Sequence, residues 1–389
     1  MNGRVPGTEN PVRITLVSHY YPAHRGGVER IAGQLAERLA RAGVAEIDWH
    51  ASDCDAPPAL AGVQCVPAHG WNGLERSVGI PYPVWAPGAL RRLGRAAAAA
   101  ELVHLHDCLY LPNLVAFMAA RLAGRPVLVT QHIGFVPYRN PLLRFLAAAA
   151  NRLIGGFVLG RATRVVFESD SVRKYFEGFV RFRTAPLLVP NGVDTEVFVP
   201  AEPAQREALR VRHGATAATP LFLFIGRFVE KKGLPVLHAL AQRFPEVRWV
   251  LAGWGPLDPG TWGLPNVTVV RMPAIEDLLP LYQAADLFVL PSVGEGMPLA
   301  LQEAMACGTP ALIGTQTAAG SPGAPILAEP TGTEDTAARW AIRIEAVLRE
   351  PQGLHGLRPR VAAFAREHWS WGACVELYAG IVRDCMEGA

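Results

Sequence analysis

Short apolar runs rich in β-branched residues alternate with stretches of helical periodicity along this chain, and the alternation occurs twice. The first series of predicted strands is Val12–Ser18, Ile47–Ala51, Val63–Pro67, Leu102–His106, Val127–Thr130 and Arg164–Glu168. The second series is Leu221–Ile225, Arg248–Ala252, Val267–Val270, Leu287–Leu290 and Ala311–Ile313. Helical patterns between these runs predict parallel sheets that helices cover on both faces. We therefore expect an α/β protein with two doubly wound, Rossmann-like domains facing a cleft.

The length of 389 residues agrees with two domains of ordinary size. Residues 1–11 are predicted to be a flexible tail, residues 12–199 the first domain and residues 220–368 the second. The segment 200–219 is rich in Ala, Glu and Pro and has no strand pattern, so we predict a linker there. Residues 369–389 are predicted to form a C-terminal amphipathic helix.

The composition disfavours several classes of protein. Half of the residues are hydrophobic and 18% are charged, which argues against disorder. The six cysteines are scattered without a Cys-x-x-Cys pair, so neither structural zinc nor a disulfide framework is expected. The sequence has no secretory signal pattern and no uninterrupted apolar run of membrane-spanning length, so we expect a cytoplasmic protein. An aromatic and basic nucleic-acid surface pattern is also missing, and nucleic acid is not an expected partner.

The small net charge of +3 hides an asymmetry between the two halves. Residues 1–195 carry 21 Lys and Arg against 14 Asp and Glu, whereas residues 196–389 carry 16 against 20. A basic first half can attract an anionic substrate or membrane surface. An ordinary solvated face is the alternative interpretation.

The turn after the first predicted strand contains Gly26 and Gly27 and leads into a helix. Glycine lets the backbone approach a ligand closely, and the free N–H groups of a helix N-terminus bind phosphate. A tight turn without a ligand is the alternative. The spacing differs from the G-x-G-x-x-G of dinucleotide-binding proteins.

A second candidate site follows the strand that begins at Leu221. Arg227 ends this strand, and Lys232 precedes the next helix. Arginine can hold two oxygens at once and lysine acts as a point charge, so the pair suits a diphosphate. Two solvated surface cations are the alternative, and the pattern differs from that of a P-loop.

The stretch from Glu295 to Glu303 runs from a loop into a helix. Glu295 could contact a sugar hydroxyl, and Glu303 could accept hydrogen bonds from a ribose diol. The backbone N–H groups of Gly296, Met297 and Leu299 could bind phosphate. Two solvated carboxylates are the alternative.

Histidines lie at the ends of two predicted strands in the first domain, at the edge where such folds bind ligands. Alternation points His104 toward the core. His132 leads into an irregular loop and is the stronger candidate for a functional residue.

Together these segments resemble glycosyltransferase family 4, the retaining group 1 glycosyl transferases of the two-domain GT-B architecture. The matching motifs follow one another along nearly the whole chain. They are Tyr21-Pro22…Gly26-Gly27-Val28-Glu29, His104-Leu105-His106-Asp107, Thr130-Gln131-His132, Val189-Pro190-Asn191-Gly192-Val193-Asp194, Gly226-Arg227…Lys231-Lys232-Gly233, Gly253-Trp254-Gly255-Pro256, Glu295…Glu303 and Trp369-Ser370-Trp371…Tyr378.

The resemblance implies transfer of a hexose-type sugar from a nucleotide-sugar donor to an acceptor hydroxyl, with retention of configuration. It implies no cofactor and no metal, because cations and a helix N-terminus neutralise the leaving diphosphate. In the first domain, the Gly26-Gly27 turn would approach the phosphates and His132 would lie beside the sugar and acceptor. The C-terminal helix would cross back to the first domain.

In the second domain the resemblance implies that Arg227 and Lys232 neutralise the diphosphate. Glu303 would hold the nucleotide ribose and Glu295 the transferred sugar. The segment Gln316–Pro330 lacks the Pro-Glu pair that the family usually has near the donor sugar. The nucleotide and the sugar therefore stay open, whereas the catalytic residues match.

Two other functions fit the same fold: a nucleotide-sugar epimerase or hydrolase, and an inactive partner subunit that binds nucleotide. The cell-envelope role and the acceptor rest on another segment. The arginines of Arg139–Arg164 and the apolar stretch Leu142–Leu159 favour a glycan or lipid-linked acceptor and peripheral contact with the anionic inner membrane. A core-facing helix with ordinary surface arginines is the alternative.

Overall fold

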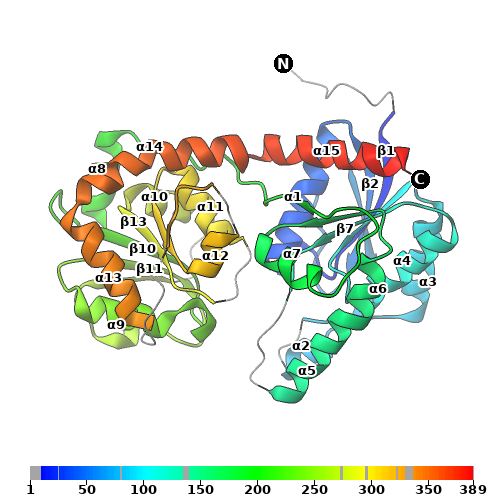
Figure 1. Cartoon of the computed structure of the whole chain (residues 1–389), viewed down its shortest axis with the longest axis horizontal. Coiled ribbons are helices and arrows are strands. Elements are labelled where there is room, and N and C mark those ends of the chain that lie inside the picture. Colours follow the sequence, from blue (N-terminus) through cyan, green and yellow to red (C-terminus); the bar gives the residue numbers. More distant parts are fainter. Residues whose placement is uncertain are drawn as a thin grey trace. The chain divides into compact units, whose positions relative to one another are not determined.

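The computed structural model describes residues 10–24, 26–78, 81–134, 140–271, 275–293, 297–320, 323–328 and 336–388. The chain divides into two compact units, Met1–Gly192 with Gly372–Ala389, and Val193–Trp371 (Figure 1). Each unit is an α/β domain around its own parallel sheet.

The first unit contains the following elements. They are β1 (Val12–Val17), η1 (Pro22–His24), α1 (Gly27–Arg41), β2 (Ala45–Ser52), β3 (Val63–Ala68), β4 (Gly70–Trp71), α2 (Gly73–Val78), β5 (Val84–Trp85), α3 (Pro87–Ala99), β6 (Leu102–His106), α4 (Leu111–Leu122), β7 (Val127–Gln131), α5 (Pro141–Ala150), η2 (Asn151–Gly155), α6 (Gly156–Leu159), β8 (Arg164–Phe167), α7 (Asp170–Glu177), β9 (Leu187–Leu188) and nearly all of α15 (Trp371–Glu387).

The first sheet has the strand order β3-β2-β1-β6-β7-β8-β9, and all of its strand pairs are parallel. Strands β6 and β7 are buried along their whole length, as expected for parallel strands covered on both faces. Figure 1 shows α1 on one side of this sheet and α3 and α4 on the other. The strand order reverses between β1 and β6, so the loops after these strands are where such a fold binds ligands.

The second unit is built in the same way. Its elements are α8 (Pro203–Arg212), β10 (Leu221–Arg227), η3 (Glu230–Lys232), α9 (Leu234–Arg243), β11 (Arg248–Trp254), η4 (Pro259–Trp262), β12 (Val267–Arg271), α10 (Ile275–Ala284), β13 (Leu287–Leu290), α11 (Leu299–Ala306), β14 (Ala311–Ile313), α12 (Thr315–Ala319), β15 (Leu327–Ala328), α13 (Thr336–Arg349) and α14 (Pro351–His368). The parallel sheet has the order β12-β11-β10-β13-β14-β15, which reverses between β10 and β13. The prediction of two doubly wound α/β domains is confirmed.

The segment 200–219 differs from the predicted linker. It contains α8, where Leu209 and Arg210 are buried, and it belongs to the second unit. The division lies instead at residues 192 and 193, where Val193 exchanges backbone hydrogen bonds with Trp369 and Trp371. The sequence pattern did not predict α8, because the helix is mostly polar and is held in place by charge pairs with a distant residue.

The apolar stretch Leu142–Leu159 forms most of α5, then passes through the π-helical turn η2 into α6. The structure describes every residue of α5 and none of them is buried, so this helix does not face the core. By length and composition, Pro141–Leu159 passes as a candidate membrane span, with 22% of its window buried. The sequence shows no uninterrupted apolar run in this segment, because Arg144 and Arg152 interrupt it.

Candidate active site

Three cations of the second unit lie at or just after the carboxyl end of β10: Arg227, Lys231 and Lys232. Arg227 is exposed, and its guanidinium carbon lies 4.7 Å from the centre of the Trp254 ring. This stacking restricts the guanidinium without removing it from solvent. The pairing of β10 with β11 places the two residues side by side. The sequence analysis assigned Trp254 no role, although its glycine-flanked motif was visible.

The backbone turns tightly after β10 and brings the Lys232 side chain back to the end of that strand. A Cβ on Gly226 would lie 3.8 Å from Lys232 Cδ, so the lysine stem covers the end of the strand. Gly233 has φ +82°, and a Cβ there would lie 2.2 Å from the carbonyl oxygen of Pro291. Only glycine fits this close approach. The turn is thereby fixed against the loop that follows β13, and the Val293 N–H donates to Lys231 O at 3.0 Å.

The helix that follows this loop contains Glu303, the residue predicted to bind the ribose. Glu303 lies within α11 and is 4% exposed, and its Oε2 accepts a hydrogen bond of 2.8 Å from the Tyr282 hydroxyl. Tyr282 therefore orients the carboxylate. Met297 and Leu299 lie at the N-terminal end of α11, where backbone N–H groups are not used within the helix. Glu295 and Gly296 lie outside the described residues, so their predicted roles stay predictions.

In the first unit, Gly26 and Gly27 begin α1 as predicted. The carboxylate of Glu29 folds back over this turn, since a Cβ on Gly26 would lie 2.0 Å from Glu29 Oε2. Glu29 Oε1 lies 2.9 Å from His19 Nε2, and both side chains are 4% exposed. Burial raises the pKa of Glu29, but the hydrogen bond and charge of His19 outweigh it and lower this pKa overall. The positive end of α1 therefore already faces a carboxylate.

His132 follows β7 and is held at both ring nitrogens. Nδ1 pairs with Glu168, and Nε2 lies 2.8 Å from His106 Nδ1. Burial lowers the pKa of His132, but the charge and hydrogen bond of Glu168 outweigh it and raise this pKa overall. Burial and the neighbouring histidines lower the pKa of His106 well below its usual value, so the shared proton stays on His132.

This histidine pair rests on a strained loop after β6. Asp107 has φ +65°, a conformation that is uncommon for a residue with a side chain. Its Oδ1 accepts hydrogen bonds from the N–H groups of His132 and Ile133, both at 3.0 Å, and from Gln131 Nε2 at 2.8 Å. Burial raises the pKa of Asp107. Strain of this kind concentrates at functional sites.

The sequence patterns did not single out Glu168, which directly follows β8 and pairs with His132, the residue after the neighbouring strand β7. Its second oxygen accepts a hydrogen bond of 3.0 Å from Asn191 Nδ2. Both Asn191 and His132 lie in motifs that carried the resemblance. One signal could have identified Glu168: it is a carboxylate at the carboxyl end of the predicted strand that follows the strand of His132 along the chain.

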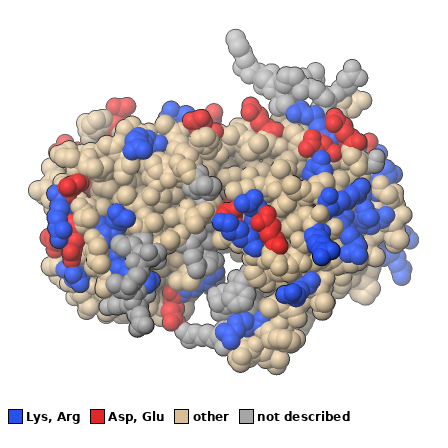
Figure 2. Space-filling model, in the orientation of Figure 1, with Lys and Arg blue, Asp and Glu red and all other residues tan. Residues whose placement is uncertain are grey.

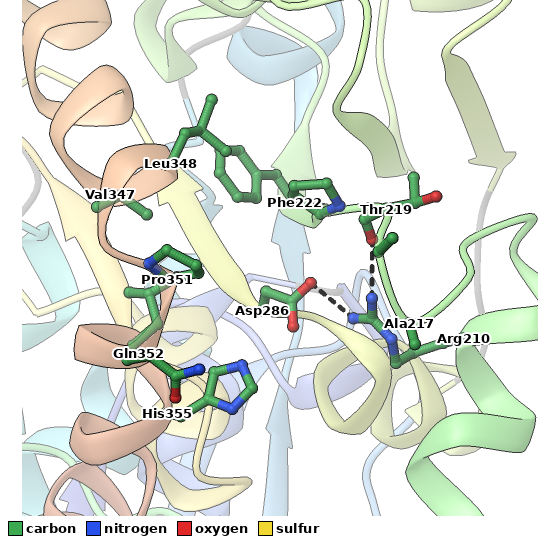
Figure 3. A pocket seen from close by; sticks show the side chains of 13 residues that line it. Arg210, Ala217, Thr219, Phe222, Asp286, Val347, Leu348, Pro351, Gln352 and His355 are labelled. Carbon is green, nitrogen blue, oxygen red and sulfur yellow. Dashed lines mark hydrogen bonds and ion pairs between the residues drawn. The ribbon is translucent and has the colours of Figure 1, made fainter.

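A pocket of about 320 Å³ in the second unit lies at the opposite edge of its sheet, at the amino ends of β10 and β13. Figure 3 shows Asp286 pointing toward Arg210 within it. Arg210 donates to Asp286 at 2.6 Å and to the carbonyl oxygens of Thr216 and Thr219 at 2.9 and 2.8 Å. These polar groups satisfy one another, so we regard this network as structural. Among the described residues, no cluster of three or more His, Cys, Asp and Glu side chains could hold a metal ion.

Comparison with known proteins agrees with this geometry. The model of "Glycosyltransferase Family 4" matches residues 25–197, and that of "Glycosyl transferases group 1" matches residues 219–349. The chain is 30% identical to a D-inositol 3-phosphate glycosyltransferase of Xylanimonas cellulosilytica, over 96% of this chain and 98% of the relative.

Two solved structures share the fold. Sucrose-phosphate synthase of Thermosynechococcus elongatus has a TM-score of 0.71 at 21% identity, covering 97% of this chain and all of that one. HepE of Anabaena in complex with UDP-glucose has a TM-score of 0.70 at 17% identity, covering 96% and 99%. The fold and the matching motifs define a glycosyltransferase of GT-B architecture. The chain belongs to glycosyltransferase family 4.

Proposed function

We propose that this glycosyltransferase moves a hexose-type sugar from a nucleotide-sugar donor to an acceptor hydroxyl, with retention of configuration. The observation that carries the proposal is the position of Arg227 and Lys232, which both lie at the carboxyl end of β10, beside the loop that leads to α11. HepE of Anabaena, which shares the fold, forms a complex with UDP-glucose, and this supports a nucleotide-sugar donor here.

The second unit binds the donor in this proposal. Charge accumulates on the diphosphate as the bond from the sugar carbon to the phosphate oxygen breaks, and the two cations stabilise that charge. Glu303, oriented by Tyr282, accepts hydrogen bonds from the ribose, and Glu295 contacts the sugar. Arg227 and Lys232 supply the positive charge that a divalent metal would otherwise supply, so we propose a reaction without metal or cofactor.

The first unit binds the acceptor. The acceptor oxygen attacks the sugar carbon on the face from which the diphosphate departs, and the acceptor proton passes to a phosphate oxygen of the leaving group. The Gly26-Gly27 turn approaches the phosphates, although Glu29 limits how much negative charge it attracts. His132, held by Glu168 and His106, presents a fixed positive group beside the sugar.

Cell-envelope polysaccharide or glycolipid synthesis is the role that we propose. The relative from Xylanimonas cellulosilytica is named for D-inositol 3-phosphate, which supports a small hydroxylated acceptor. The proposal includes a cytoplasmic location and peripheral contact with the anionic inner face of the membrane.

The test is release of nucleoside diphosphate from a panel of nucleotide sugars in EDTA, with crude lipid extract as acceptor. Release from one donor that depends on the extract, and that falls about 100-fold or more in Lys232→Ala, supports a metal-independent transferase. Glu295→Ala tests the sugar contact in the same assay. Release without extract would indicate hydrolase or epimerase chemistry instead. Inversion at the anomeric carbon, read by NMR of the product, would contradict the retaining mechanism.

A further inference from the structure

Helix α5 and the turn η2 that continues it present a stripe of large apolar side chains to solvent. Leu142, Phe145, Leu146 and Leu153 have exposed fractions of 64, 68, 53 and 73%. Their spacing places them along one side of the continuous helix formed by α5 and η2. Surface helices of globular proteins normally turn such a stripe toward the core. An apolar stripe that faces outward marks a surface that contacts another apolar phase.

The charge around this stripe has one sign. Residues 108–167 contain seven arginines and neither Asp nor Glu. Arg144, Arg152 and Arg161 are exposed on or just after the helix. Arg152 and Arg161 lie over aromatic rings, 5.5 Å from Phe179 and 4.5 Å from Phe157. In the part of the chain that the structure describes, no carboxylate pairs with Arg144 or Arg152. Figure 2 shows Lys and Arg gathered over α4 and α6, and mostly uncharged atoms over α5.

We propose that α5, with its flanking arginines, docks this protein on the surface of an anionic lipid bilayer. This docking surface specifies the membrane contact of the proposed function, and only the choice of a lipid surface as partner rests on that function. Apolar side chains enter the boundary between headgroups and acyl chains, while arginines beside them bind lipid phosphates. A second copy of the chain suits the surface poorly, because a two-fold contact would bring unpaired arginines together.

The helix lies on the bilayer and does not cross it. Its C-terminal part, α6, is packed into the first unit, where Val158 and Leu159 are fully buried. Strand β8 follows a few residues later and pairs with β7 and β9. Spanning would pull α6 out of the core and place Arg144 and Arg152 within the hydrocarbon layer. An in-plane helix leaves the fold unchanged.

The test is co-sedimentation of the full chain with vesicles of equal parts phosphatidylglycerol and phosphatidylcholine, and with vesicles of phosphatidylcholine alone. Arg144→Glu with Arg152→Glu reverses the charge, and Phe145→Ser with Leu146→Ser removes the apolar contact. Arg212→Glu with Arg360→Glu is the charge control, because both arginines are exposed in the second unit. Val197→Ser with Val211→Ser is the apolar control, with exposed fractions of 48 and 64%.

We expect the unaltered chain to sediment with the anionic vesicles and not with the neutral ones. Each α5 double variant should weaken this binding at least about tenfold, and the controls should not. High salt should release the protein. Absence of binding by the unaltered chain, or equal losses in the controls, would overturn the proposal. So would light scattering that shows a dimer abolished by the Phe145 and Leu146 changes.

Nucleoside diphosphate release with a water-soluble acceptor should persist in both α5 variants, which separates failure of docking from failure of the transferase function.

Discussion

The imidazole of His132 is held at both nitrogens, so its position and charge depend on residues outside its own loop. Glu168 favours the protonated form of the imidazole by raising its pKa, and His106 Nδ1 accepts a hydrogen bond from the Nε2–H of His132. The ring is 4% exposed. A group held in this way suits electrostatic positioning of a substrate better than exchange of protons with it.

Substitution of Glu168 by Gln tests this interpretation. The folded pKa of His132 lies above its usual value, so the pair stabilises the fold fully below the unfolded pKa, and this stability is lost as pH rises through the folded pKa. Glu168→Gln should cost about 3 kcal/mol of unfolding free energy at pH 6 and distinctly less at pH 9. Urea unfolding at both pH values measures it. Glu177→Gln, which alters an exposed ion pair of the same unit, is the control; equal costs at the two pH values would contradict the assignment.

The strain at Asp107 makes a second prediction. Asp107→Ala loses three accepted hydrogen bonds and keeps the positive φ, whereas Asp107→Gly loses the same bonds and relieves the strain. Both variants should be less stable than the unaltered chain, but the glycine variant should be more stable than the alanine variant by about 1 kcal/mol. Thermal unfolding compares them directly. An alanine variant as stable as the glycine variant would show that the loop carries no strain.

At the scale of elements, Asp286 joins three segments of the second unit. It pairs with Arg206 and Arg210 of α8, and its Oδ2 accepts a hydrogen bond of 2.8 Å from the Leu221 N–H at the start of β10. Asp286→Ala would leave the buried Arg210 without its carboxylate. We expect a loss of about 3–5 kcal/mol in unfolding free energy.

Urea unfolding followed by circular dichroism measures that loss. Asp258→Ala is the matched control, because it removes an exposed carboxylate paired with Arg271 in the same unit and should change stability little. Equal stability of the two variants would show that α8 docks without help from Asp286.

The strands could be predicted because buried parallel strands are continuous apolar runs, readable one segment at a time. The predicted strand Leu102–His106 coincides with β6, and Leu287–Leu290 with β13. Helix α8 could not be predicted in this way, because its Arg210 is fixed by a carboxylate 76 residues further along the chain. Glu168 was missed for the same reason: its contact with His132 exists only because β7 and β8 are neighbours in the sheet. Local patterns therefore indicated most strands of the two sheets, but not the charge pairs between distant segments.

At the scale of the whole molecule, the two units offer different chemistry at the carboxyl edges of their sheets. The second unit presents Arg227 and Lys232 at the carboxyl end of β10, beside the loop that leads to α11, and two such cations suit a diphosphate. The first unit presents a buried network of histidines and carboxylates, whose polar groups can form hydrogen bonds with hydroxyl groups. This division agrees with a donor bound by the second unit and an acceptor bound by the first.

The most direct test of the donor site is calorimetric binding of nucleoside diphosphates in EDTA to the unaltered chain, to Lys232→Ala and to Lys231→Ala. Lys231 is the matched control, because it is the neighbouring exposed lysine of the same turn. We expect one nucleoside diphosphate to bind without metal, Lys232→Ala to weaken it at least about tenfold, and Lys231→Ala to leave it unchanged. Binding only when a divalent metal is added, or equal losses in both variants, would contradict a donor site built on Arg227 and Lys232.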